Sequence, residues 1–153
     1  MSPSLSTPEF SGADKYDLER FVVAQEGIYE RAYTELQSGS KRSHWMWFIF
    51  PQIRGLGLSE MSVRYAISSL DEARAYLEHR VLGARLRKIT ETVAALNGRT
   101  AEQIFGYPDD MKFHSCMTLF ARAANEESIF EIALGRYFNG AMDAETLKRL
   151  SCL

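Results

Sequence analysis

The sequence predicts an all-α fold, a single compact domain of about eight short helices without significant sheet. The first observation is the spacing of apolar residues, which recur every three or four positions and so share one face of a helix. The second is the capping box, a Ser or Thr followed three residues later by Glu or Gln, which occurs at 69–72 and at 100–103. Both patterns are typical of helices.

The length and composition fit one such domain. The chain has 153 residues, of which 46% are apolar and 25% charged, and this balance excludes a disordered chain and a coiled-coil rod. The net charge of −2 gives no overall field that would mark a nucleic-acid or membrane binder. Two cysteines, Cys116 and Cys152, are too few for a disulfide framework or a four-thiolate zinc site, so we expect a reducing, cytoplasmic location.

The folded domain is expected to follow a flexible tail. Residues 1–13 are rich in Ser, Pro, Thr and Gly and show no apolar period, so we assign 1–13 to the tail and 14–153 to the domain. Residues 1–15 lack the apolar segment of a secretory signal. The longest apolar run, 45–50, is far shorter than the roughly 20 residues that cross a membrane.

One helix is predicted on each side of Gly27, because glycine inside a helix lowers its stability by about 1 kcal/mol relative to alanine. The first begins at Asp17, whose carboxylate is expected in the first turn, where the helix dipole favours an acid. The second covers 28–37 and ends at Ser38 and Gly39. The apolar faces consist of Leu18, Phe21 and Val22 in the first helix and Ile28, Ala32 and Leu36 in the second.

The block 44–50 is apolar at every position except His44, so periodicity does not decide between a short helix capped by Ser43 and a buried strand. We favour the helix, because no other segment offers a strand partner and a lone strand leaves its backbone donors unpaired. Such a block would aggregate if it were exposed to water, so it is expected in the core.

The rest of the chain predicts further short helices after the loop 52–58. Ser59 is expected to cap the first of them, Pro108 to begin another, and Asp143 to cap the last. The predicted segments are 59–68, 71–78, a stripe over 82–96, a short turn at 100–106, 108–123, 129–138 and the residues after Asp143.

Six strings of this sequence resemble one family. They are SHWMWFIFPQ at 43–52, GLGLS at 55–59, EARAYL at 72–77, LGARL at 82–86, IFG at 104–106 and MTLF at 117–120. The chain resembles, over about 17–150, the mainly bacterial family called domain of unknown function 1810, whose members have sometimes been labelled calpastatin. The resemblance implies a stand-alone, mostly helical cytoplasmic domain, and no established activity, substrate or catalytic residue. The sequence departs from the family at Arg80, where proline is usual, and at Cys116, where serine is usual.

The loop 54–59 is the first candidate site. Gly55 and Gly57 can let backbone N–H groups turn inward as an anion-binding nest, and the following helix would point its positive end at the same place. Arg54 and Ser59 would add a charged donor and a hydroxyl. The alternative is that the glycines only form a tight turn, and the spacing matches neither the P-loop nor the dinucleotide motif.

The aromatic block is the second candidate. Trp45 or Trp47 could stack on a planar ring, and His44 could donate to a phosphate or act as a base. The alternative is core packing, with His44 at the rim. Arg85, beside the apolar stripe of its helix, either extends outward or reaches a buried anion.

The other polar residues support weaker predictions. Asp109 and Asp110 complement a helix start, although Asp110 or His114 could act as a base with Lys112 as partner and Ser115 nearby. The three histidines lie 35 residues apart and no Cys-x-x-Cys occurs, so we expect no metal and no cofactor. A covalent hydrolase motif is absent from the sequence.

Two functions of different classes remain open. The favoured one is binding of a small anionic, nucleotide-like ligand in a pocket beside the Trp-Met-Trp block and the Gly-Leu-Gly loop, because a pure scaffold needs no polar residues around an apolar block. The alternative is a non-enzymatic protein-interaction module. Nucleic-acid binding is a weaker alternative, because only three cations flank the aromatics. The sequence predicts no reaction. The residues expected at the ligand site are His44, Trp45, Trp47, Gln52, Arg54, Gly55, Gly57, Ser59 and Arg85.

Overall fold

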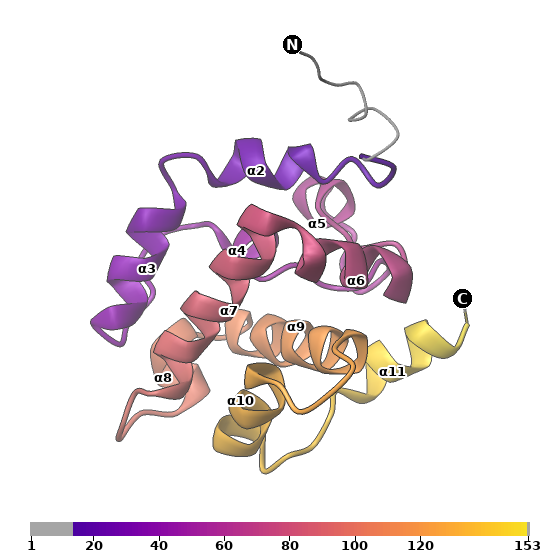
Figure 1. Ribbon diagram of the computed structural model, residues 1–153. Coiled ribbons are helices and arrows are strands. Elements are labelled where there is room, and N and C mark those ends of the chain that lie inside the picture. The colour runs from indigo at the N-terminus through magenta and orange to yellow at the C-terminus, as the bar shows by residue number, and fades with distance from the viewer. Residues whose placement is uncertain (1–13, 153) are drawn as a thin grey trace.

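The computed structural model describes residues 14–152, and within this range ten helices and no strand form (Figure 1). The all-α prediction is therefore confirmed, with more helices than the eight or so expected; the predicted tail, 1–13, lies outside the described residues. In chain order the helices are α2 (Glu19–Gln25), α3 (Tyr29–Gln37), α4 (Met46–Ile49), α5 (Glu60–Arg64), α6 (Leu70–Glu78), α7 (Arg80–Ala94), α8 (Ala101–Phe105), α9 (Asp109–Ala123), α10 (Ile129–Phe138) and α11 (Ala144–Ser151).

Helix α9 forms the centre of the molecule. It packs against α6 on one side and α10 on the other, and α7 contacts both of these neighbours (Figure 1). Nine of its fifteen residues are buried, and they point in most directions around the helix, as expected of a helix enclosed by others. Every helix contributes at least one side chain to the single hydrophobic core or packs one against it.

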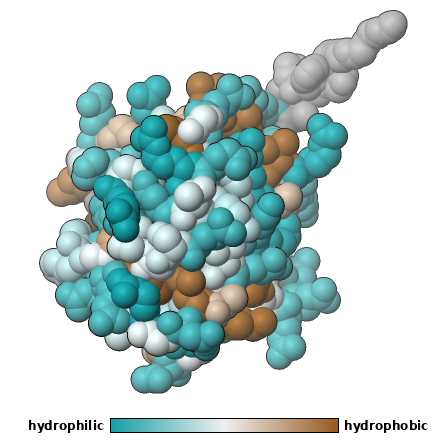
Figure 2. Space-filling view, turned by 90° about the vertical axis from the view of Figure 1, so that its left-hand side faces the viewer, coloured by the Kyte–Doolittle hydropathy of each residue, from teal (hydrophilic) through white to brown (hydrophobic). Residues whose placement is uncertain are grey.

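The face of the molecule that carries α3 and α8 is mostly hydrophilic (Figure 2). Its hydrophobic residues form small, separate areas, which are normal on a folded surface and need no partner. None of the helices described in 14–152 is long and apolar enough to cross a membrane.

Most predicted helix starts are confirmed. Ser59 and Asp143 each accept a hydrogen bond from a backbone N–H in the first turn of the following helix. Thr100 and Gln103 form the complete capping box that the sequence predicts. Ser69 also caps its helix, but only half of that box forms, because the carboxylate of Glu72 accepts from Ser68 and Arg20 instead.

Some predicted boundaries are wrong. Helix α2 begins at Glu19, and the backbone N–H of Leu18 is satisfied by the Asp14 carboxylate at 2.6 Å, while Asp17 precedes the helix with a left-handed φ of 54°. Helix α5 ends at Arg64 and not near residue 68, because the chain then extends to pair Ile67 with Ile53 in an isolated parallel bridge.

The apolar block forms a helix of one turn, α4, with Trp45 and Phe50 at its ends. The prediction of helix over strand is confirmed. The prediction that Ser43 caps it is wrong: its hydroxyl donates to Glu35 Oε2 at 2.5 Å, and Trp45 occupies the cap position without a side-chain bond.

Glu35 is the main polar anchor of this block. Its Oε1 accepts from the indole N–H of Trp45 at 2.9 Å and from the backbone N–H groups of Arg42 and Ser43. Partial burial alone would raise the pKa of Glu35, but these bonds together with the Ser43 hydroxyl lower it from 4.5 to about 2. The carboxylate therefore ties the end of α3 to the segment that leads into α4.

Aromatic side chains fill the core below the block. Phe105 and Phe113 stack at a centroid distance of 4.6 Å, and Phe50 meets both edge-on. Trp45 lies beside Phe50 with none of its surface exposed. These pairs join α4, α8 and α9 in one aromatic cluster, which buries the large apolar surface that stabilises the fold.

Gly83 allows α7 to approach the end of α6. A Cβ at this position would collide with the carbonyl oxygen of Leu77. We therefore expect Gly83→Ala to lower the free energy of unfolding by about 3 kcal/mol, the upper end for overpacking against backbone. The matched control is Gly135→Ala in α10, where a Cβ meets nothing within 4 Å, and which should stabilise by roughly 0.5–1 kcal/mol. Urea unfolding of both variants measures the difference, and equal stabilities would contradict the close approach.

Glu35→Gln is expected to lower the free energy of unfolding by about 2 kcal/mol near neutral pH, because a neutral amide replaces a carboxylate that accepts four hydrogen bonds. The native pKa of about 2 lies below the ordinary 4.5, so this contribution is fully present above about pH 4.5 and is lost as the pH falls toward 2. Urea unfolding of both proteins as a function of pH should show a constant difference in the free energy of unfolding above about pH 5, and this difference should become smaller below that pH. A free-energy difference that stays unchanged in acid would show that Glu35 acts by packing alone.

Candidate functional site

A pocket of about 280 Å³ lies where the loop after α4 meets α5, α9 and the start of α11. It brings together four of the nine residues predicted from the sequence, namely Trp47, Gln52, Gly55 and Gly57. The others in its wall include Tyr65, Met111, Lys112, Ser115, Asp143 and Glu145. We call this hollow the Trp47 pocket.

The loop wall of the Trp47 pocket is held by backbone pairing. The N–H of Arg54 donates to Ile67 O and the N–H of Ile67 donates to Gln52 O, both at 2.8 Å. Gly55 has a left-handed φ of 99°, and a Cβ at this position would lie only 3.0 Å from Nη1 of the Arg149 guanidinium in α11. A Cβ on Gly57 would lie 2.5 Å from Ser62 Oγ. Both glycines are therefore required for the close packing of this loop against α5 and α11.

Another part of the wall is Asp143, the residue that caps α11. Its Oδ2 accepts from the backbone N–H and the hydroxyl of Thr146 at 3.0 and 2.7 Å, and lies 3.2 Å from the Ser115 hydroxyl. These bonds hold a carboxylate and a hydroxyl at fixed positions in the pocket wall. They give the pocket polar groups that can orient a ligand.

A second hollow of about 290 Å³ adjoins the Trp47 pocket, because Trp47, Pro108 and Lys112 line both. We call it the Lys112 hollow. Lys41, His44 and Asp109 are also in its wall. The Lys112 ammonium lies 5.3 Å from the centre of the Trp47 ring, within the range of a cation–π contact.

The three residues of the aromatic block that the sequence predicts at the ligand site differ in their exposure to solvent. Trp47 is half-buried and available to a ligand, whereas Trp45 has no exposed surface and its indole N–H is bonded to Glu35. His44 is exposed and lies in the wall of the Lys112 hollow. Trp47 and His44 are thus both accessible in the wall of the Lys112 hollow. Trp45 is also in that wall, but its side chain is fully buried and belongs to the core.

Arg54 and Ser59 do not line the Trp47 pocket. The side chain of Ser59 is used locally, because its oxygen accepts from the backbone N–H of Ser62 at 3.1 Å and lies 2.9 Å from the Ser62 hydroxyl. Arg54 is exposed. Helix α5 has five residues, so its dipole contributes little at this place. The structure brings the glycines to the pocket but not the donors expected beside them.

Arg85 lies in a different region, at the junction of α2, α3 and α7. Its Nη1 donates to Gln25 Oε1 at 3.1 Å, and Gln25 in turn donates to Phe48 O and to the hydroxyl of Tyr76. The guanidinium lies 5.3 Å from the ring of Tyr29. Arg85 therefore supports the packing of the core and does not join the other predicted residues.

The remaining candidates are mostly committed to structure. His114 stacks on Phe138 at 3.9 Å, and its Nε2 lies 2.8 Å from Ala141 O. Burial raises the pKa of the Cys116 thiol well above its ordinary value, so this residue is not a reactive thiolate. In residues 14–152 no group of three or more His, Cys, Asp or Glu side chains is arranged to hold a metal ion.

Sequence reasoning missed the pocket roles of Met111, Asp143 and Glu145. Asp143 was identifiable as a helix cap. The cap pattern does not predict, however, that Asp143 lines the same pocket as a loop some 90 positions earlier in the chain. No local signal could have assigned these residues, because tertiary packing alone brings them to Trp47.

Comparison with known proteins places the chain in a family. A search of the curated proteins finds no match. Among solved structures, the chain is similar to the crystal structure of the conserved hypothetical protein Rv1873 from Mycobacterium tuberculosis, with a TM-score of 0.88 and 51% identity over 90% of this chain and 99% of that one. The family described as "Protein of unknown function (DUF1810)" matches residues 15–150, close to the span expected from the motifs. The chain therefore belongs to the DUF1810 family.

Proposed function

We propose that this domain binds a small anionic, nucleotide-like ligand in the Trp47 pocket. The observation that carries the proposal is the position of Trp47, a half-buried indole that lines the pocket with a lysine ammonium 5.3 Å from its ring. Half-buried aromatic rings beside a charge are typical of sites that stack a planar group and hold an ionic one.

The other walls of the pocket support a ring with polar edges. Gln52 offers both a donor and an acceptor, while Ser115 and Asp143 are fixed by their bonds to α11 and α9. Tyr65 and Met111 supply apolar surface. A volume of about 280 Å³ lies just below the usual range of small-molecule sites, so one planar ring system fits the pocket better than a large cofactor.

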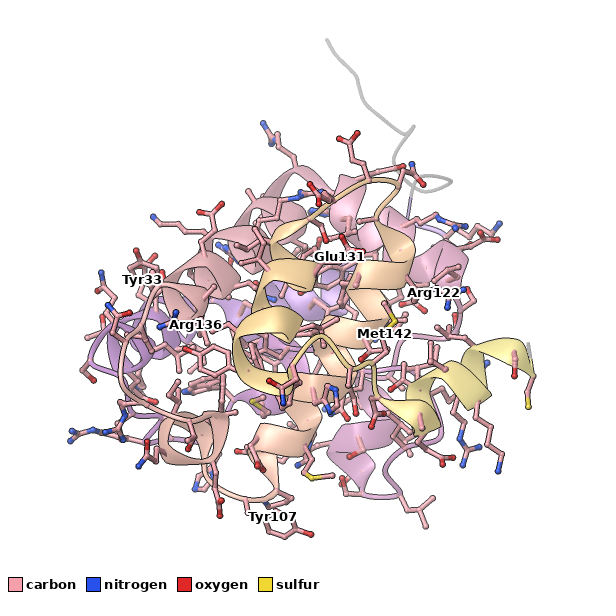
Figure 3. All side chains as sticks on the ribbon, turned by 90° about the horizontal axis from the view of Figure 1, so that it is seen from below. Tyr33, Tyr107, Arg122, Glu131, Arg136 and Met142 are labelled. Atoms are coloured by element: carbon pink, nitrogen blue, oxygen red, sulfur yellow. The ribbon has the colours of Figure 1, made fainter. Side chains whose placement is uncertain are left out.

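A protein-interaction module is the second candidate, and one observation favours it. Leu58, Tyr107 and Met111 are exposed by 93%, 75% and 52%, and they lie on or next to the walls of the two hollows. Tyr107 extends outward at the edge of the molecule (Figure 3). Nucleic-acid binding has less support, because Lys41, one of the three flanking cations, is paired with Asp109 at 2.8 Å. The cytoplasmic location stays a prediction.

Trp47→Leu should weaken ligand binding about tenfold or more, because it removes the stacking surface and keeps an apolar side chain. The probes are adenosine, AMP, ADP and ADP-ribose, measured by calorimetry and by thermal shift, since a bound ligand stabilises the fold. Trp45 and Trp47 are the two tryptophans of the chain. A ligand that changes the tryptophan fluorescence of the wild type but not that of Trp47→Leu therefore binds next to Trp47.

The matched control is Tyr33→Leu, which removes a half-buried aromatic side chain on a different side of the molecule from Tyr107 (Figure 3). It should leave binding unchanged. If none of the four probes binds the wild-type protein, ligand binding of this class is wrong. A protein partner lost on Leu58→Asp would then favour the interaction module.

A further inference from the structure

We infer that the anionic group of the ligand is held in the Lys112 hollow, by Lys112 and His44, and not by the Gly-Leu-Gly loop. The inference rests on the proposed function and divides its site into two parts. The planar ring would lie in the Trp47 pocket, and an oxyanion such as a phosphate would lie on the other side of the ridge formed by Trp47, Pro108 and Lys112.

The charges of the two hollows are segregated. Asp143 and Glu145 are in the wall of the Trp47 pocket, where Lys112 is the single cation of the wall. Lys41 and Lys112 face one carboxylate, that of Asp109, in the Lys112 hollow. An anion is therefore repelled by the acids of the first hollow and attracted by the net positive charge of the second.

Asp109 compensates mainly Lys41. Its Oδ2 lies 2.8 Å from Lys41 Nζ, which also donates to Ser43 O at 2.6 Å and whose side chain is only 7% exposed. Its Oδ1 lies 3.5 Å from Lys112 Nζ, beyond the length of a charge-assisted hydrogen bond, and the Lys112 side chain is 28% exposed. The ammonium of Lys112 thus keeps donors for a ligand at the boundary of the two hollows.

His44 completes this subsite. Its exposed imidazole lies in the wall of the same hollow and can donate a hydrogen bond to an oxyanion. Arg54 and Ser59, which the sequence predicts as the anion-binding residues, do not compete with this subsite for the anion. Arg54 is exposed outside the pocket wall, and Ser59 caps its own helix. The ligand class that fits both parts is one planar ring system, such as a purine, with a hydrogen-bonding edge, joined to one oxyanion.

The test compares AMP with adenosine, which lacks the phosphate, by calorimetry on three variants. AMP should bind the wild type about tenfold or more tightly than adenosine, and Lys112→Met should abolish that preference. Lys88→Met is the matched control, because Lys88 also lies over an aromatic ring, that of Tyr33 at 5.0 Å, outside both hollows. It should change AMP affinity less than about twofold, and Arg54→Met should do the same.

The outcomes separate the inference from the proposed function. If AMP affinity survives Lys112→Met and falls in Arg54→Met, the anion lies at the glycine loop and the inference is wrong, while the ligand pocket stands. Equal affinity of AMP and adenosine for the wild type also overturns the inference alone. If neither probe binds the wild type, the proposed function fails. Should Lys112→Met not fold, His44→Ala and the charge-preserving Lys112→Arg replace it. His44→Ala removes the donor and must weaken AMP binding, whereas Lys112→Arg must retain it.

Discussion

The hydrogen bond from the buried indole of Trp45 to Glu35 is the interaction on which the rest of the structure depends. A fully buried indole N–H needs an acceptor, and a partly buried carboxylate is stabilised by several donors. Glu35 meets both needs, because it also accepts from the backbone of Arg42 and from Ser43. This anchor fixes the turn of α4 between α3 and the aromatic cluster, and two residues further on the same turn presents Trp47 to the surface.

The position of Trp47 in turn organises the surface around it. After α4 the chain extends to the Ile53–Ile67 bridge, so the glycine loop folds back under α5 and α11. Pro108 and Lys112, at the start of α9, close the other side. The charged residues of this region are not spread evenly. Asp143 and Glu145 line the Trp47 pocket, whereas Lys41 and Lys112 share the Lys112 hollow with a single carboxylate, that of Asp109. This arrangement of charges is the basis of the proposal that the ligand has a planar end and an anionic end.

Other motif residues have structural roles that explain why these residue types occur. Gly83 lies where two helices meet too closely for a side chain, and the half-buried Arg85, two residues further on, reaches Gln25 to satisfy a buried amide. Glu72, in the half-formed capping box, pairs with Arg20 at 3.1 Å and so joins α6 to α2. These motifs hold helices together, and the residues of the two hollows come instead mainly from 44–57 and 107–115, with further residues from α5 and the start of α11.

The sequence by itself determined the helical class, most helix starts and the burial of the aromatic block apart from Trp47, because apolar spacing and capping depend on residues within one or two turns. It also indicated Trp47, Gln52 and the two glycines as neighbours, since they are close along the chain. Only the tertiary structure decided that Arg85 lies elsewhere, that Ser43 serves Glu35 and not α4, and that Lys112 and Asp143 adjoin Trp47. These contacts join segments tens of residues apart, and no local pattern encodes which polar side chain meets which partner once helices pack.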